Sequence, residues 1–201
     1  MNLEYREPHS KSELQALFQM RQEVFAGDPF LSKMVKSNSA IDINGFDVNA
    51  LHFGAFELGK PVAYIRIATT HKTSFTNWVH NIIANQQMHI AQQDFQFPFL
   101  TYYPDLKWSQ HFLDSLKDRN IGEVGKLAIK RDYRKGGETL NRLIQSFIHY
   151  CKFNKGIDTG FGICALKLAR YYKRFGFKPA HGARNFVYQD LPKAIVVRFD
   201  K

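Results

Sequence analysis

The feature that most constrains the fold is a change of pattern within residues 121–151. Residues 122–129 alternate and then become apolar, as a buried or half-buried strand would. A basic, glycine-rich segment follows at residues 130–137, and from Leu140 to Cys151 apolar residues recur at helical spacing. The segment therefore predicts a strand, a glycine loop and an amphipathic helix, in that order.

A glycine loop that leads into a helix has a physical use. The first N–H groups of a helix have no partner inside it, and the helix dipole makes that end positive. Glycines let the backbone approach a ligand closely, and Arg131, Arg134 and Lys135 add full positive charges. The loop therefore predicts a socket for a phosphate or pyrophosphate. The alternative is an ordinary strand-to-helix turn with a solvated basic face.

The same residues resemble a known family. Residues 134–139, Arg-Lys-Gly-Gly-Glu-Thr, are similar to the R/Q-x-x-G-x-G/A loop with which GNAT acyltransferases hold the pyrophosphate of coenzyme A. Thr139 stands where that family has Gly or Ala. Residues 123–129, Glu-Val-Gly-Lys-Leu-Ala-Ile, resemble the E-x-S-R-x-A-V strand of acyl-homoserine-lactone synthases and N-acyl amino acid synthases. In that comparison Lys126 replaces the family's Arg and Gly125 its Ser.

The rest of the chain fits an α/β pattern. A helix is expected from Ser12, with Ser10 or Ser12 as its cap and Gly27-Asp28-Pro29 as its end. A hairpin is expected from strands at residues 50–57 and 61–68. Later in the chain we expect a short strand at 158–165, a helix at 166–175 and two terminal strands at 181–188 and 193–199. The ending of the last helix, Tyr172 to Phe177, is similar to the Y-x-x-x-G-F ending of GNAT proteins. The resemblance implies one domain, residues 1–201, with a GNAT-like mixed central β-sheet flanked by helices.

Two segments have less definite patterns. Residues 69–120 form a helical, aromatic-rich insertion, with helices expected from about Thr76 to Gln92 and around Trp108 to Leu116, ending by Asn120. This insertion, whose aromatic residues include those at 95–103, is interpreted either as an acyl-chain pocket or lid, or as a satellite core that packs onto the sheet. Residues 30–47 are expected to be a loop.

Composition limits the partners. The 201 residues carry a net charge of +10, which favours a polyanionic partner such as coenzyme A, acyl carrier protein, nucleic acid or an anionic membrane. The basic residues gather at 126–135 and 167–178 without a nucleic-acid motif, so a small anionic ligand or an acidic carrier protein is favoured. No apolar window is long enough to span a bilayer and no signal peptide is evident, so a cytoplasmic protein is expected. Cys151 and Cys164 lack metal-ligand spacing, and no metal site is expected.

The resemblance implies direct acyl transfer from a thioester to an amine. Glu123 matches the family's strand glutamate, which implies a role as general base. Tyr172 matches the family's tyrosine whose phenol protonates the leaving thiolate, which implies a role as general acid. The alternatives are a salt-bridged structural Glu and a buried Tyr that only forms a hydrogen bond. Backbone amides of Leu127, Ala128 and Ile129 would stabilise the oxyanion and pair with the pantetheine arm.

The remaining candidates are binding residues. The pyrophosphate or phosphopantetheine phosphate would be held by Arg131, Arg134, Lys135, Gly136, Gly137 and Thr139. Arg21, in an R-x-x-V-F segment like that of the acyl-homoserine-lactone synthases, Arg66, at the family's strand arginine, and Lys126 are candidate substrate-binding residues. The alternative for Arg21 is a surface residue of an amphipathic helix, and the alternative for Arg66 is an outward-facing residue at the surface of the sheet.

The function implied is that of an N-acyltransferase. It would use acyl-CoA or acyl-phosphopantetheine on acyl carrier protein as co-substrate, with no tightly bound cofactor, and an amine such as an amino acid or related small molecule as acceptor. The alternatives are an acetyl-CoA-dependent N-acetyltransferase of a small amine and a non-catalytic acyl-CoA-binding domain. A nucleic-acid-binding module is a further alternative, from charge alone.

Overall fold

The computed structural model describes residues 2–29, 32, 35, 39–88, 97–98, 105–188 and 191–201. The helices are α1 (Lys11–Ala26), α2 (Thr76–Asn85), α4 (Leu106–Asp114), α5 (Glu138–His149) and α6 (Leu166–Tyr172). The strands are β1 (Glu4–Arg6), β2 (Ala50–Glu57), β3 (Lys60–Thr69), β4 (Ile121–Ile129), β5 (Thr159–Ala165), β6 (Lys178–Pro179), β7 (Phe186–Tyr188) and β8 (Leu191–Asp200).

These strands form one mixed sheet. Their order is β1-β2-β3-β4-β5-β8-β6, with β7 also paired to β8. Among the described strands, β4 and β5 are the one parallel pair, and the other pairs are antiparallel. The mixed central sheet flanked by helices confirms the GNAT-like fold class.

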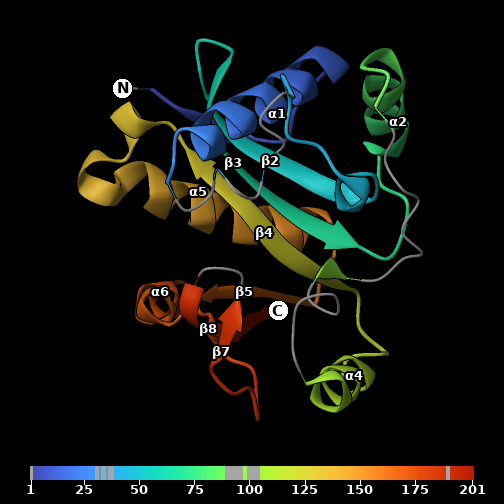
Figure 1. Cartoon of the computed structure of the whole chain (residues 1–201), viewed down its shortest axis with the longest axis vertical. Helices are drawn as coiled ribbons and strands as arrows, with labels where there is room; N and C mark the ends of the chain where they lie inside the picture. Colours follow the sequence, from blue (N-terminus) through green and yellow to red (C-terminus); the bar gives the residue numbers. More distant parts are fainter. Residues whose placement is uncertain are drawn as a thin grey trace.

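Helices cover both faces of the sheet, because successive strand residues point to opposite sides. His52 packs against Phe18 of α1, whereas its neighbour Phe53 packs against Phe147 of α5. Figure 1 accordingly shows α1 on one side of β2, β3 and β4, and α5 on the other. We call these the α1 face and the α5 face.

The insertion contributes a core of its own. Helix α4 places Phe112 against Phe161 of β5, and Trp108 stacks on Phe112. Phe97 joins the same buried cluster. The structure therefore confirms the satellite core for this part of the insertion, and Figure 1 shows α4 at the β5–β8 half of the molecule. Most of the aromatic segment 95–103 lies outside the described residues, so the lid hypothesis stays untested.

Local signals placed most elements correctly, with a few exceptions. Ser10 caps α1 by accepting a hydrogen bond from the Glu13 N–H, and the Ala50–Glu57 strand of the hairpin has the expected bounds. Helix α2 ends at Asn85 and α4 at Asp114, both earlier than expected. The expected end of the first of these helices, Gln92, lies outside the described residues.

The terminal strands also need correction. The strand expected at 181–188 covers residues 186–188, because residues 181–185 form a turn and a loop. Short strands β1 and β6 were not expected, since two or three residues carry no periodicity. Among the described residues, no helix has the length and apolar character needed to cross a bilayer.

Phe112 and Phe153 offer a matched test of the second core. Phe112, on the buried side of α4, is 5% exposed, whereas Phe153 is 69% exposed. We expect Phe112→Ala to lower the free energy of unfolding by about 3–5 kcal/mol, because it removes a buried ring and leaves a cavity. Phe153→Ala should change it by less than about 0.5 kcal/mol. Urea unfolding measures both, and equal effects would show that α4 does not pack as described.

Candidate functional site

The parallel strands β4 and β5 separate soon after they meet. Their pairs are Ile121 with Thr159, Gly122 with Gly160 and Glu123 with Phe161. Beyond these pairs lies a cavity of about 130 Å³. Residues 124–127 of β4 and 162–164 of β5 line it, with side chains from Ile65, Ile144, Tyr172, Phe177 and Val197. Because consecutive residues of both strands line the cavity, it lies in the gap between the two strand edges.

A bulge bends β4 at this gap. Tyr64 faces Ala128 and Arg66 faces Gly125, so two residues of β4, Lys126 and Leu127, lie opposite one residue of β3. Lys126 has a φ of 57°, a left-handed conformation that is uncommon for a residue with a side chain. The strand edge that borders the cavity is therefore shaped by a locally strained backbone.

Tyr172 and Cys164 meet at this cavity. Burial raises the pKa of Tyr172, with Cys164 and Tyr171 adding to the effect, so the phenol stays protonated at neutral pH. Burial also raises the pKa of Cys164 to about 12, so its thiol is protonated as well. Tyr172 thus lines the cavity with a protonated hydroxyl, and its role as general acid stays a prediction.

Glu123 lies at the last paired position of β4 and is buried. It faces Ala68 across the β3–β4 pair, and Gly125 faces Arg66. Directly opposed residues of an antiparallel pair share a face, so Glu123, Gly125 and Arg66 all lie on one side of the sheet. His52 opposes Arg66 and packs against α1, which identifies this side as the α1 face.

The glycine loop lies at the start of α5. Gly136 and Gly137 have φ values of 70° and 71°, a conformation that glycine adopts without strain. A Cβ at either position would meet no atom within 4 Å among the described residues, so the backbone there is accessible. Gly137 is the N-cap of α5, and Thr139 is buried in its first turn.

The charged side chains of the loop are mostly in solvent. Arg131, Arg134 and Lys135 are exposed, and the Arg134 Nε donates a hydrogen bond of 2.8 Å to the Ile129 carbonyl. This bond ties the loop to the end of β4. Of the predicted donor-binding residues, Leu127 lines the cavity, whereas Ala128, Ile129 and the loop residues do not.

The predicted substrate-binding cations lie in a buried network on the α1 face. Arg21 is 0% exposed and donates to both carboxylate oxygens of Asp47, each at 2.9 Å. Its Nε lies 2.7 Å from the Asp42 carboxylate, and it also donates to the Asp42 carbonyl. Arg66 donates to Asp47 at 2.6 Å and to Asn44 at 3.2 Å. The surface alternatives for Arg21 and Arg66 are therefore wrong.

Lys126 extends this network to the cavity. Its ammonium lies 2.9 Å from the Asp42 carboxylate and above the ring of Phe25. Burial and the nearby Arg21 lower the pKa of Lys126, against the opposing effect of Asp42. The structure thus brings together Arg21, Arg66 and Lys126 around two carboxylates, Asp42 and Asp47.

His52 and Tyr64 complete the network with neutral groups. The His52 Nε2 lies 3.1 Å from the Asp47 carbonyl, which can only accept, so Nε2 carries the proton. The Nδ1, 2.8 Å from the Tyr64 hydroxyl, must then accept from it. The same hydroxyl accepts from Arg21 at 3.0 Å. Both ring nitrogens of His52 and the Tyr64 hydroxyl are thus paired.

The sequence of this chain also matches the sequence profile of a known protein family. The sequence profile of the FeeM N-acyl amino acid synthases matches residues 16–197. The chain belongs to this family. It is an N-acyltransferase, as the sequence predicts. No curated protein sequence matches the chain.

Solved structures show the same fold. FeeM, an N-acyl amino acid synthase from uncultured soil microbes, has a TM-score of 0.57 at 13% identity, over 99% of this chain and 91% of that one. BjaI, a CoA-dependent acyl-homoserine lactone synthase, has a TM-score of 0.61 at 15% identity, and the match covers 94% of this chain and 76% of that one. ElaA of Escherichia coli has a TM-score of 0.56 at 16% identity, and the match covers 99% of each chain.

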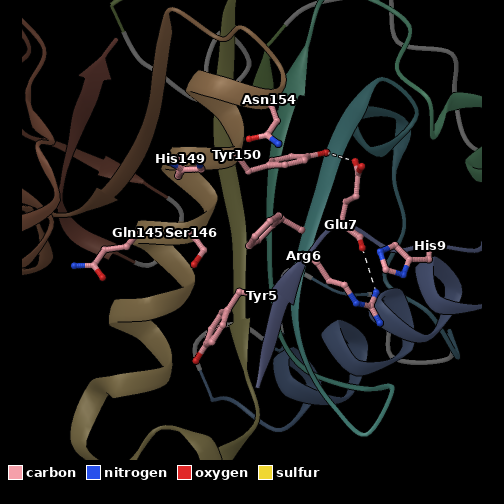
Figure 2. Close-up of a pocket in the computed structure, with 10 residues that line it drawn as sticks. Tyr5, Arg6, Glu7, His9, Gln145, Ser146, His149, Tyr150 and Asn154 are labelled. Carbon is pink, nitrogen blue, oxygen red and sulfur yellow. Dashed lines mark hydrogen bonds between the residues drawn. The ribbon is translucent and has the colours of Figure 1, made fainter. Parts of the chain in front are cut away.

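A larger cavity, of about 570 Å³, lies elsewhere on this acyltransferase. Figure 2 shows it between β1 and α5, with Tyr5, Gln145, Ser146 and His149 around it. None of the predicted site residues lines it. Its charged side chains are already paired, Arg6 with Glu13 and Glu7 with Lys155, so its size alone does not make it the active site.

Several network residues were missed in the sequence: Asp42, Asp47, His52 and Tyr64. Asp42 and Asp47 lie in a segment expected to be a plain loop, where Asn44 in fact caps a single 3₁₀ turn, Gly45–Asp47. The signal available in the sequence was Arg66 within a predicted strand, because a buried charge needs a partner of opposite charge. Among the described residues, no group of three or more His, Cys, Asp or Glu side chains could hold a metal ion. The expectation of no metal stays a prediction.

His52 makes the stability of this acyltransferase depend on pH. Burial lowers the pKa of His52 to about 3, with Arg21 and Arg66 adding to the effect and Asp47 opposing it. An unfolded histidine has a pKa of about 6.5. Between these values the unfolded chain binds a proton that the folded chain does not, so stability falls as pH is lowered from about 6.5 toward 3. The slope should approach about 1.4 kcal/mol per pH unit.

Urea unfolding between about pH 6.5 and 5 tests this, in the range below the histidine's reference pKa. His52→Gln, which keeps one donor and one acceptor, should be less stable but should lose this part of the slope. His9→Gln, at an exposed histidine, serves as the control and should keep it. Parallel curves for wild type and His52→Gln would contradict the assignment.

Proposed function

We propose that this enzyme transfers an acyl group from acyl-CoA or acyl carrier protein to the amino group of an amino acid or a related small amine. The observation that supports it most is the gap between β4 and β5. The cavity there is lined largely by backbone and apolar side chains, and the charged network lies on the α1 face of the same strands. An apolar thioester and a polar acceptor can approach each other across β4.

The donor would lie along the open edge of β4. Residues 124–127 line the cavity, and backbone groups on the β4 edge that faces β5 would suit the amides of a pantetheine arm, which can pair with a strand edge as another strand would. The accessible loop at Gly136 and Gly137 would hold the phosphate, with Arg131, Arg134, Lys135 and Thr139 around it. A solved structure of BjaI contains isopentyl-CoA and SAM, which supports a CoA thioester as one donor in this fold.

The chemistry needs no protein nucleophile. The amine loses a proton to Glu123 as it attacks, a C–N bond forms, and the oxyanion is held by backbone amides near Leu127, Ala128 and Ile129. The C–S bond then breaks, and the thiolate takes a proton from Tyr172. The raised pKa of Tyr172 suits an acid that must be protonated before the reaction.

The acceptor would bind on the α1 face. Arg66 and Lys126 are the cations proposed to meet it, whereas Arg21 has no exposed surface and would act by holding Asp42 and Asp47 in place. A carboxylate on the acceptor, as in an amino acid, would suit two cations. We also propose that residues 1–201 act as one domain, because the described strands share one sheet. A cytoplasmic location stays a prediction.

The donor preference is the main test. We expect decanoyl-CoA or decanoyl acyl carrier protein to be used with at least tenfold higher kcat/KM than acetyl-CoA, since the strand of residues 123–129 resembles that of long-chain enzymes. Mass spectrometry of the acylated amine, with free amino acids as acceptors, measures it. Preference for acetyl-CoA would instead support the acetyltransferase alternative. Thioester binding without any transfer would support a binding domain.

Tyr172 and Glu123 have separable roles. Tyr172→Phe keeps the ring in the cavity but removes the proton donor, and Glu123→Gln keeps the shape but removes the base. We expect each to lower kcat by about 10²-fold or more, with thioester binding nearly unchanged. Tyr171→Phe, beside Tyr172 but absent from the cavity lining, is the matched control. If both variants retain wild-type kcat, other residues carry the proton transfers.

A further inference from the structure

The glycines of β4 and β5 differ in whether close packing requires a residue without a side chain at their positions. A Cβ at Gly122 would lie 2.5 Å from a carbon of Ile67, and one at Gly162 would lie 2.5 Å from the Val124 carbonyl oxygen. At Gly160 it would lie 2.2 Å from the ring of Phe199. These three glycines are therefore needed for close packing.

Gly125 has no such reason to be glycine. A Cβ there would meet no atom of the described residues within 4 Å, and its φ is outside the left-handed region. A larger residue in a strand interior would normally favour the strand, because glycine weakens it. The empty space at Gly125 is thus not explained by packing or by backbone conformation.

The space lies where the two halves of the proposed reaction meet. Gly125 lines the cavity between β4 and β5, and it opposes Arg66 on the α1 face, the face that also carries Glu123. Arg66 is 4% exposed, and its Nε is buried without a hydrogen-bond partner among the described residues. A buried donor left unpaired is costly, so a ligand group that accepts from it would be stabilised.

We propose that the space over Gly125 is the acceptor subsite, which takes a carboxylate-bearing amine, and that residue 125 sets the size of acceptor that fits. The inference rests on the proposed function. The carboxylate lies against Arg66, and the amine lies between Glu123 and the thioester in the cavity. A side chain at position 125 would occupy the acceptor's place without disturbing the donor's arm along the edge of β4.

Substitution at Gly125 tests the size rule. In Gly125→Ala and Gly125→Val we expect KM for free amino acids to rise stepwise, by roughly 10- to 200-fold in the Val variant, and most for bulky acceptors. The melting temperature should stay at the wild-type value, and the thermal shift induced by decanoyl-CoA should change much less than KM for the acceptor, because the added side chain lies on the α1 face. Gly162→Ala, across the gap, is the contrasting variant: it should lower the melting temperature, because its Cβ clashes with backbone.

A second measurement does not depend on turnover. The native thiols of Cys151 and Cys164 are buried, and burial raises the pKa of both, so they react slowly with alkylating reagents. In Gly125→Cys we expect iodoacetamide to label position 125, and an amino acid that is an acceptor to slow that labelling at least fivefold. Free amino acids, added one at a time, are the probes.

The outcomes separate the two proposals. If wild type transfers acyl groups and Gly125→Val keeps its KM for every amino acid, the subsite is wrong and the proposed function stands. If wild type transfers nothing, the proposed function fails, and protection of the introduced thiol in Gly125→Cys by an amino acid still decides whether the space binds one. Absence of protection by any amino acid that the enzyme acylates overturns the subsite.

Discussion

The separation of β4 from β5 is the constraint around which this structure is arranged. Two parallel strands that share three residue pairs would normally continue to pair, since unpaired backbone groups away from water are costly. Here β4 bends at the bulge that begins at Lys126 and leaves the pairing. The cavity that results borders two rows of backbone groups, one on each strand. A ligand with amide groups of its own can satisfy them, as water would in its absence.

The two faces of β4 then present different environments. On the α5 face, Ile65 and Ile144 make the cavity apolar, whereas on the α1 face Asp47 receives hydrogen bonds from both Arg21 and Arg66. Burial alone would raise the pKa of Asp47, but Arg21 and Arg66 hold it far below its usual value. Buried charges are tolerated because each has a partner, and removing one partner would leave the others uncompensated. One strand therefore borders an apolar cavity on one face and a charged network on the other.

Periodicity and turn residues predicted what is local, namely α1 with its Ser10 cap, the β2–β3 hairpin, and the β4–loop–α5 unit. They could not predict the charge network, because its members are distant in the chain. Asp47 meets Arg21 and Arg66 from a segment whose composition indicates only a loop. His52 and Tyr64 occupy ordinary strand positions, and their hydrogen bond appears only when register is known. Of the residues that line the gap, the family resemblance named Lys126, Leu127 and Tyr172, and their roles stay predictions. The open space that the described residues leave at Gly125 appears only in the folded structure.

The distance between loop and cavity constrains the donor further. The glycine loop ends at Gly137, and the cavity touches α5 at Ile144, seven residues further on. At 1.5 Å per residue these positions are about 10 Å apart along the helix. A donor whose phosphate binds the loop would therefore need an arm of about 10 Å to place its thioester in the gap. A phosphopantetheine arm meets this requirement and an acyl phosphate does not, because its acyl carbon is bonded directly to the phosphate. Coenzyme A and acyl carrier protein share that arm, so a choice between them depends on contacts outside the gap, where Arg131, Arg134 and Lys135 face solvent.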